Sequence, residues 1–155
     1  MMSKIEIPKD VAVLCEQIAK GHARRKKSYE NKRLDIIYSG AASGSFADRV
    51  GGAKGSGVSD PNAVKAERLE RLESSLDAHF VKAVEQALLM LGADVSQESQ
   101  KRLRKAVLIN CENGKEYPFE FLGLDEFSRR DFYRRRKRFI IGIGAELGLI
   151  DGYGV

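Results

Sequence analysis

The sequence predicts a mostly α fold for three reasons: apolar residues recur at helical spacing along most of the chain, helix starts carry capping residues, and the 155 residues include only three prolines. A chain of this length can form one ordinary core, or a small core with helical appendages. In order, we expect N-terminal helices, a glycine-rich linker and a long helix that leads into a C-terminal helix-turn-helix. The expected boundaries are 1–38 for a basic helical segment, 39–59 for the linker, and 60–155 for a helical domain with its helix-turn-helix at about 97–150.

The N-terminal segment is expected to be helical from Lys9 to about Tyr38. Its stretch from Lys20 to Arg33 carries seven basic residues against one acidic residue. Two interpretations stay open for this stretch: a solvated helix surface, or a secondary set of contacts to the phosphates of a nucleic acid. The adjacent cations that would make such contacts are Arg24, Arg25, Lys26 and Lys27.

Glycine and serine dominate residues 39–57, with six glycines and four serines in 19 residues. Such a composition offers little apolar surface to bury, so it predicts a flexible linker. A phosphate-binding loop is the alternative. The segment lacks the pattern G-x-x-x-x-G-K-[ST], and no buried strand leads into it, so the linker is favoured.

A further helix start is predicted at Asp60, whose carboxylate can cap the first turn while Pro61 takes the first helical position. Apolar residues then recur mostly every three or four positions as far as Leu91, which predicts a helix of about 30 residues and roughly 45 Å. The rest of so small a chain cannot cover all of that apolar seam. The helix therefore either bends near Ser74 and Ser75 or pairs with a second subunit, and we favour a homodimer.

The C-terminal part predicts a helix-turn-helix. A first helix is expected over 97–111, with an apolar stripe at Leu103, Val107 and Cys111. A short segment over 117–122 and a turn at Gly123 follow. The last helix is capped by Ser128 and continues to Leu147 without a proline.

This last helix opens with a dense cluster of charge. Residues 128–138 read SRRDFYRRRKR: six arginines and one lysine against one aspartate give +6, whereas the whole chain carries +5. At about 100° per residue, the inward stripe comprises Phe132, Phe139, Ile143 and Leu147. The opposite face comprises Arg130, Arg134, Lys137 and Arg138, with Tyr133 beside it. One packed face and one cationic face are typical of a recognition helix in the DNA major groove, and a solvated basic surface is the alternative.

Not every arginine of the cluster fits the cationic face. Arg136 projects only about 40° from Phe132, so we expect it to snorkel, pair with a carboxylate or lie at the edge of the packed face, and we assign it to structure. The candidates for DNA contact are Ser128, Arg129, Arg130, Tyr133, Arg134, Lys137 and Arg138. Arginine can hold guanine through two hydrogen bonds, which favours a target site that contains guanine.

Residues 84–150 resemble the sigma-factor region-four type of helix-turn-helix found in phage-encoded transcriptional regulators of the RinA and ArpU kind. The resemblance is carried by SRRDFYRRRKRFIIGIGAELGLI, where Ser128 caps, Phe132 points inward, Tyr133 and Arg134 begin the contact face, and AELGLI closes the helix. The stretch GGAKGSGVSDPNAVKAERLE is similar to the glycine-rich segment and helix start of such proteins. The turn region GKEYPFEFLGLDEF is longer and more aromatic than a standard sigma-type turn. The resemblance implies sequence-specific binding of promoter DNA in a phage or prophage operon, with host RNA polymerase as a further partner.

No catalytic or metal site is expected. Cys15 and Cys111 each lie among apolar residues and are expected to be buried thiols. With His22 and His79 they lack metal-ligand spacing, so no zinc site is predicted. A nuclease would need carboxylates that hold a metal, and the carboxylates nearest the arginines are Asp125, Glu126 and Asp131. They show no ligand spacing and no nucleophile with its base, so we expect no cofactor and no enzymatic activity.

The sequence also bears on location and function class. No apolar run approaches the roughly 18 residues of a membrane span, and Met1 to Asp10 lacks the features of a signal peptide, so a cytoplasmic protein without membrane contact is expected. The favoured function is a sequence-specific transcriptional regulator that inserts the helix starting at Ser128 into the major groove of double-stranded DNA. A phage DNA-packaging protein similar to a small terminase subunit is the alternative. A nonspecific DNA-binding structural protein is a third class, which sequence selectivity would exclude.

Overall fold

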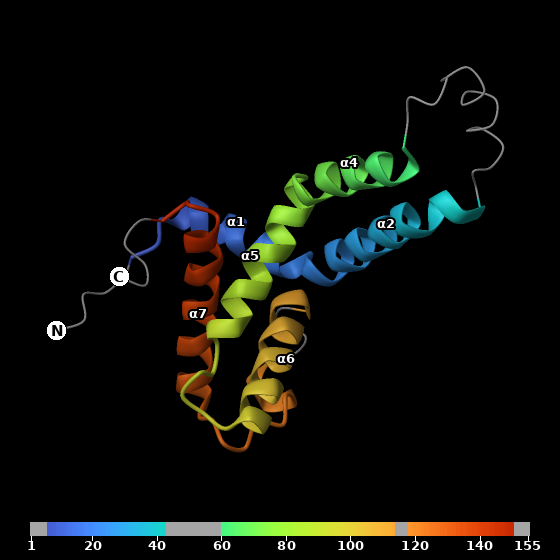
Figure 1. Ribbon diagram of the computed structural model, residues 1–155. Helices are drawn as coiled ribbons and strands as arrows, with labels where there is room; N and C mark the ends of the chain where they lie inside the picture. The colour runs from blue at the N-terminus through green and yellow to red at the C-terminus, as the bar shows by residue number, and fades with distance from the viewer. Residues whose placement is uncertain (1–5, 43–59, 114–117, 151–155) are drawn as a thin grey trace. The chain divides into compact units, whose positions relative to one another are not determined.

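The structure is a computed structural model that describes residues 6–42, 60–113 and 118–150. These residues form six α-helices and one 3-10 helix with no strand among them, which confirms the mostly α prediction (Figure 1). The α-helices are α1 (Lys9–Lys20), α2 (His22–Ala42), α4 (Pro61–Glu73), α5 (Leu76–Met90), α6 (Gln97–Asn113) and α7 (Arg129–Glu146). The 3-10 helix is η3 (Phe119–Phe121). None of the described helices is long and apolar enough to cross a membrane.

The chain divides into two compact units at positions other than those expected from the sequence. The first unit comprises Met1–Ala23 and Phe80–Val155, and the second comprises Arg24–His79. Helix α1 belongs to the first unit because its apolar face, with Cys15, Ile18 and Ala19, is buried against α6 and α7. The N-terminal helix is therefore part of the C-terminal core rather than a separate segment.

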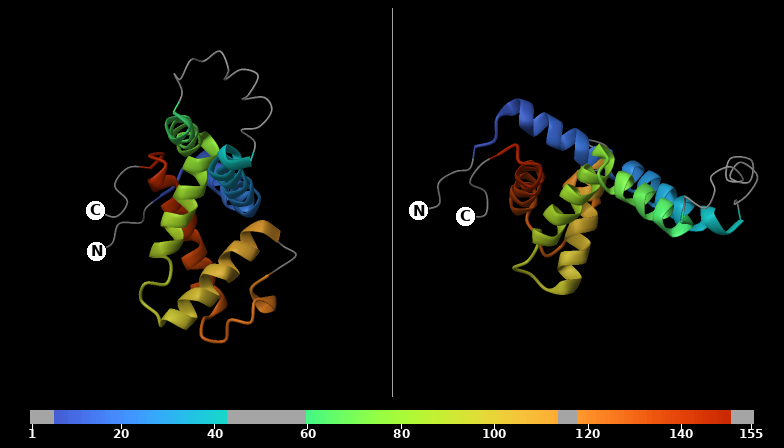
Figure 2. Two further views of the ribbon diagram at one scale, coloured as in Figure 1. Left: turned by 45° about the vertical axis from the view of Figure 1, so that its right-hand side comes forward. Right: turned by 45° about the horizontal axis from the view of Figure 1, so that its top comes forward.

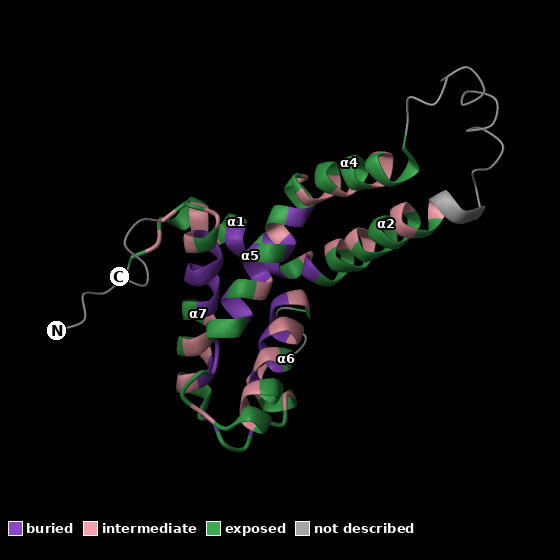
Figure 3. Ribbon diagram, viewed as in Figure 1, coloured by how far each residue is buried: buried purple, intermediate pink, exposed green. Residues whose placement is uncertain are grey.

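The core of the first unit lies between the facing sides of α1, α5, α6 and α7 (Figures 2 and 3). The stripe predicted for the last helix is correct: Phe132, Phe139 and Ile143 are buried, and Leu147 packs against them. The stripe predicted for 97–111 is also correct, since α6 buries Leu103, Val107 and Cys111. These two stripes fix the rotation of α6 and α7 about their own axes. They therefore decide which side chains of α7 face outward.

Side chains of α6 hold the end of α5. Gln100 Nε2 donates to the Leu91 carbonyl over 3.1 Å, and Arg104 donates to the Leu89 carbonyl over 3.0 Å. Gly92 makes the turn with a φ of 76°, in the left-handed region that favours glycine. One carbonyl near the end of α5, that of Leu89, and the carbonyl of Leu91 just after it are thus satisfied by side chains of the next helix.

The predicted start at Asp60 is confirmed, but the 30-residue helix is wrong. Asp60 Oδ1 accepts a hydrogen bond from the Asn62 amide over 3.0 Å, with Pro61 at the first position of α4. The helix ends at Glu73 and a new one begins at Leu76. The break has a local cause, because Ser74 and Ser75 donate their hydroxyls to backbone carbonyls of the last turn, and Ser75 Oγ accepts from the Ala78 amide over 3.3 Å. The bend expected near Ser74 and Ser75, as the alternative to pairing with a second subunit, is therefore present as a break between two helices.

Two other expected boundaries move. The stretch from Lys9 to Tyr38 is helical as predicted, but it is interrupted at Gly21, between α1 and α2. The predicted linker start at residue 39 is wrong, because α2 continues to Ala42 and the Ser39 hydroxyl donates to the Ile36 carbonyl within it. The remainder of the predicted linker, 43–59, lies outside the described residues.

The second unit contains most of α2, all of α4 and the first residues of α5. Within it the Tyr29 hydroxyl hydrogen-bonds to Glu73, and Arg25 lies 3.8 Å from the Asp77 carboxylate. No residue of α4 is buried. Its apolar residues Val64, Leu69 and Leu72 are all partly exposed. The apolar seam of α4 is therefore incompletely covered.

Candidate nucleic-acid interface

Helix α7 begins where the sequence predicts. Ser128 has an extended backbone, and its Oγ accepts a hydrogen bond from the Asp131 amide over 3.1 Å. Gly123, the predicted turn residue, has a φ of 66° between η3 and α7. The segment expected to be a short helix over 117–122 is a single 3-10 turn at Phe119–Phe121, and Tyr117 lies outside the described residues. The cap and the turn together set the first turn of α7.

The outer surface of α7 is cationic. Six of the seven predicted contact residues are exposed: Ser128, Arg129, Arg130, Arg134, Lys137 and Arg138. The side chains of Arg129 and Arg134 are 65% and 63% exposed. Ser128, Arg130 and Arg134 also border one shallow depression over the first turns of the helix. The helix therefore exposes these predicted residues and brings Ser128, Arg130 and Arg134 to one depression.

Tyr133 is the exception among the predicted contact residues. It is half-buried and packs against the core, with its ring edge-to-face with Phe132 at a centroid distance of 5.2 Å. The Arg129 guanidinium lies over the same ring, 5.6 Å from its centroid. The tyrosine thus supports Arg129 through a cation–π contact as well as flanking the cationic surface.

Two of the exposed arginines have carboxylate neighbours. Arg129 lies 2.6 Å from Glu120 of η3, and Arg134 lies 2.6 Å from Asp131 on its own helix. Exposed ion pairs contribute about 0–1 kcal/mol to stability, so Arg129, whose partner Glu120 is itself 51% exposed, can exchange that partner for a phosphate or a base at small cost. Among the described residues no ion pair is found for the other exposed cations, Arg130, Lys137 and Arg138.

The remaining two arginines of the cluster turn inward. Arg136, which the sequence assigns to structure, donates from Nε to Asn110 Oδ1 over 2.7 Å and from NH1 to Glu16 over 3.1 Å. The pairing with a carboxylate, one of the arrangements expected for Arg136, is therefore confirmed. Because Glu16 lies on α1 and Asn110 on α6, this one side chain links three helices.

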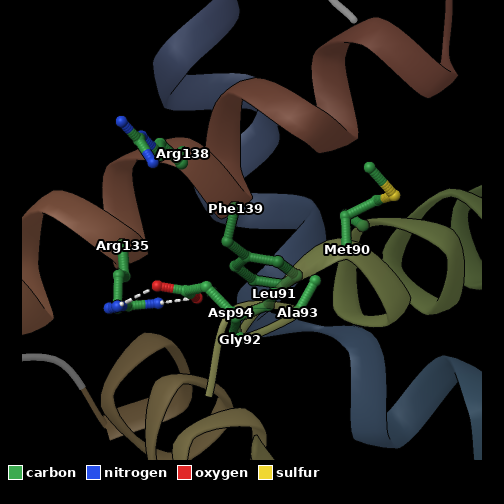
Figure 4. A pocket seen from close by; sticks show the side chains of 9 residues that line it. Met90, Leu91, Gly92, Ala93, Asp94, Arg135, Arg138 and Phe139 are labelled. Carbon is green, nitrogen blue, oxygen red and sulfur yellow. Dashed lines mark hydrogen bonds and ion pairs between the residues drawn. The ribbon is translucent and has the colours of Figure 1, made fainter.

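Arg135 has a structural role that sequence reasoning missed. Both terminal nitrogens of Arg135 donate to the Asp94 carboxylate, at 2.7 and 2.8 Å (Figure 4). Its Nε donates to Asp131 over 3.0 Å, and its guanidinium lies over the Phe127 ring. The side chain is only 14% exposed. The sequence could have indicated this role. At about 100° per residue, Arg135 lies about 60° from Phe132 around the helix axis, which puts it on the flank of the packed face.

The ion pairs of Arg135 shift the pKa values of the groups that form them. Hydrogen bonds from Arg135 lower the pKa of Asp94 to about 2, and hydrogen bonding to Asp94 raises the pKa of Arg135. Burial raises the pKa of Asp131, but the hydrogen bonds from Arg135 and Arg134 outweigh it and leave that pKa below its ordinary value. These groups therefore stay ionised at neutral pH.

A pocket of about 330 Å³ lies beside the ion pair of Arg135 and Asp94 (Figure 4). Its buried lining residues include Ala87, Leu91 and Phe139, while Met90 and Arg138 are exposed at its border. The ion pair and the side chain of Phe139 connect the turn after α5 to α7. The pocket therefore lies where α7 packs against the end of α5 and the turn that follows it.

The secondary cations all lie on α2, in the second unit. Arg24, Lys26 and Lys27 are exposed, whereas Arg25 is 15% exposed beside Asp77. The four residues therefore divide into three surface cations and one that packs within its unit.

Both cysteines and one of the two histidines are buried. Cys15 and Cys111 are buried free thiols, as predicted, and burial raises the pKa of both, that of Cys111 to about 11. His22 is buried with Nε2 3.4 Å from Glu85, and His79 is exposed. Of the carboxylates considered for a nuclease, Glu126 pairs with Arg102 and Asp131 with arginines. No group of three or more His, Cys, Asp or Glu residues that could hold a metal ion occurs within the described ranges.

The outer surface of α7 has the chemistry to bind anions. Its guanidinium groups present several N–H donors in a planar fork, which matches phosphate oxygens and the paired acceptors of a guanine edge. The chain matches no protein-family model, and comparison with curated proteins and with solved structures finds no similar chain.

Proposed function

We propose that this protein is a sequence-specific DNA-binding transcriptional regulator that inserts the N-terminal turns of α7 into the major groove. The observation that carries the proposal is the division of one helix into two faces. Phe132, Phe139 and Ile143 anchor α7 in the core, while five cations face outward: Arg129, Arg130, Arg134, Lys137 and Arg138. A major groove about 12 Å wide admits one α-helix, and cations on its outer face then meet base edges and phosphates together.

The direction of the two inward arginines supports a binding surface rather than a generally solvated one. Arg135 and Arg136 are satisfied by carboxylates and an amide, whereas Arg130, Lys137 and Arg138 are exposed with no ion pair found among the described residues, so these three cations can bind an external anion. A merely solvating surface would interleave both signs of charge. The resemblance to phage regulators adds the proposed setting: promoter DNA of a phage or prophage, in the cytoplasm, with host RNA polymerase as a partner and without catalytic activity.

The incompletely covered apolar seam of α4 supports a homodimer. Val64, Leu69 and Leu72 recur at helical spacing but remain partly exposed. A second copy that covers this seam would bury apolar area and would place two α7 helices on one DNA molecule, which multiplies affinity. The same seam is compatible with a packaging protein, for which a ring of subunits is expected. The mass of the assembly in solution separates a dimer from a ring.

Selection from random DNA tests the proposal. The protein is mixed with a pool of random duplexes at physiological salt, and the bound fraction is sequenced over several rounds. We expect one enriched motif that contains guanine, bound at least about a thousandfold more tightly than unrelated DNA. Equal affinity for all sequences would point to a nonspecific DNA-binding protein, and absence of DNA binding would refute the proposal.

A further inference from the structure

Four residues of the first unit form a continuous row of alternating charges. Asp94, in the turn after α5, accepts two hydrogen bonds from Arg135 at 2.7 and 2.8 Å. Arg135 Nε donates to Asp131 Oδ2 over 3.0 Å, and Arg134 donates to the other oxygen, Oδ1, over 2.6 Å. The row therefore leads from a turn outside α7 to an arginine on the exposed surface of that helix.

The inner part of the row is held in place. Arg135 is 14% exposed, and its guanidinium lies 5.1 Å from the Phe127 ring centroid. The Asp131 side chain is 23% exposed, and its backbone amide is fixed by the Ser128 cap. Both carboxylate oxygens of Asp131 are thus engaged in defined directions. By contrast, Glu120, the partner of Arg129, is 51% exposed.

Arg134 is held by this carboxylate but still has free donors. The hydrogen bond to Asp131 uses one terminal nitrogen, NH2, out of a guanidinium with five N–H groups. A fixed fork loses less rotamer entropy when it binds than a mobile side chain does. Orientation matters most for a base edge, because two acceptors must be met at once, whereas a phosphate accepts hydrogen bonds from many directions.

We propose that Asp131, supported by Arg135 and Asp94, is a positioning residue that presents Arg134 for a bidentate contact with guanine. The inference rests on the proposed function, since it names the base that one residue of the same surface reads. Asp131 also places a negative charge close to the DNA, which on its own opposes binding. Positioning and simple electrostatics therefore predict opposite effects when this charge is removed.

The test compares Asp131→Asn with Glu120→Gln, which also turns a carboxylate beside an exposed arginine into an amide. Affinity is measured for the selected duplex and for an unrelated duplex of the same length. We expect Asp131→Asn to weaken binding to the selected duplex about tenfold or more, with unchanged or tighter binding to unrelated DNA. Glu120→Gln should tighten binding to both. Tighter binding of Asp131→Asn to both duplexes would overturn the inference.

A double-mutant cycle separates positioning from a structural role of Asp131. If Asp131 acts through Arg134, the effect of Asp131→Asn on selected DNA should disappear in an Arg134→Ala background. A loss that persists undiminished in that background would show that Asp131 acts through the helix cap or the fold, and the inference would fail. Arg134→Lys keeps the charge without the fork. It should reproduce the loss of selectivity even if Asp131→Asn folds poorly, and retained selectivity of this variant would also overturn the inference.

The outcomes distinguish the two proposals. A parent protein that selects no DNA sequence refutes the proposed function and the positioning role together. A parent that selects a motif, with Arg134→Lys or Asp131→Asn equally selective, refutes the positioning role alone.

Discussion

The Nε of Arg136 lies 2.7 Å from Oδ1 of Asn110, a side chain that is only 4% exposed. The same guanidinium reaches Glu16 on α1. Arg136→Ala would leave the buried amide oxygen without this donor, so we expect a loss of about 1–3 kcal/mol in the free energy of unfolding, measured by denaturant titration. Arg130→Ala removes the same charge from an exposed position and should change stability by less than about 0.5 kcal/mol. Equal stability of the two variants would contradict the structural role of Arg136.

Phe132 anchors the cationic helix. Its side chain is fully buried and lies against Phe119, with ring centroids 5.5 Å apart. Phe132→Ala should lower the free energy of unfolding by about 3–5 kcal/mol, because it removes apolar contacts and leaves a cavity. Phe132→Leu fills much of that cavity and should cost clearly less. A loss below about 1 kcal/mol for the alanine variant would show that α7 is not anchored at this residue.

Substitution of two glycines with similar φ values can separate the cost of backbone strain from the cost of crowding by neighbouring side chains. Gly92 and Gly123 have φ values of 76° and 66°. A Cβ at Gly92 would lie 3.1 Å from Gln100 Cγ and 3.2 Å from Leu103 Cδ2, whereas nothing lies within 4 Å of one at Gly123. Gly123→Ala should therefore cost about 1–2 kcal/mol for the left-handed backbone alone, and Gly92→Ala about 1–3 kcal/mol more. Thermal melting of both variants checks the order, and a Gly123→Ala variant less stable than Gly92→Ala would contradict it.

Asp94 makes the stability of the fold depend on pH. Its pKa is lowered from an ordinary 3.8 to about 2, so the pairing with Arg135 stabilises the fold fully above the ordinary value and is lost as pH falls through about 2. Asp94→Asn should lower the melting temperature at neutral pH and should reduce its decline between about pH 4 and pH 2. Parallel melting curves of parent and variant across this range would contradict the ion pair.

The periodic pattern of the sequence was sufficient for the apolar stripes of α6 and α7 and for the direction of Arg136. Both follow from angles about a single helix axis, which the chain's own spacing determines. Asp60 and Ser128 could likewise be recognised as caps, because a cap bonds to amides two or three residues away. The sequence therefore predicted local geometry and the outward cations of α7 well.

Helical periodicity and capping could not predict contacts between distant segments of the chain. The pairing of Arg135 with Asp94 joins residues 41 positions apart, and the burial of α1 against α7 depends on the tertiary fold. The break between α4 and α5 was harder still, because the apolar spacing continues across Ser74 and Ser75 while their hydroxyls end the helix. Periodicity predicts which face of a helix is apolar. It does not predict where a side-chain hydroxyl takes a backbone carbonyl that would otherwise accept a helical hydrogen bond.

The most direct test of the central claim is the salt dependence of DNA binding by α7. Affinity of the parent for its selected duplex is measured between about 50 and 200 mM salt, beside an Arg134→Ala, Lys137→Ala double variant and a matched Arg24→Ala, Lys27→Ala variant on α2. If several cations of α7 displace counterions, the parent should lose about a thousandfold in affinity over this range. The α7 variant should bind more weakly with a shallower dependence on salt, and the α2 variant should change less. A flat salt response of the parent, or an α7 variant that binds as the parent does, would contradict the assignment of this helix as the DNA-binding surface.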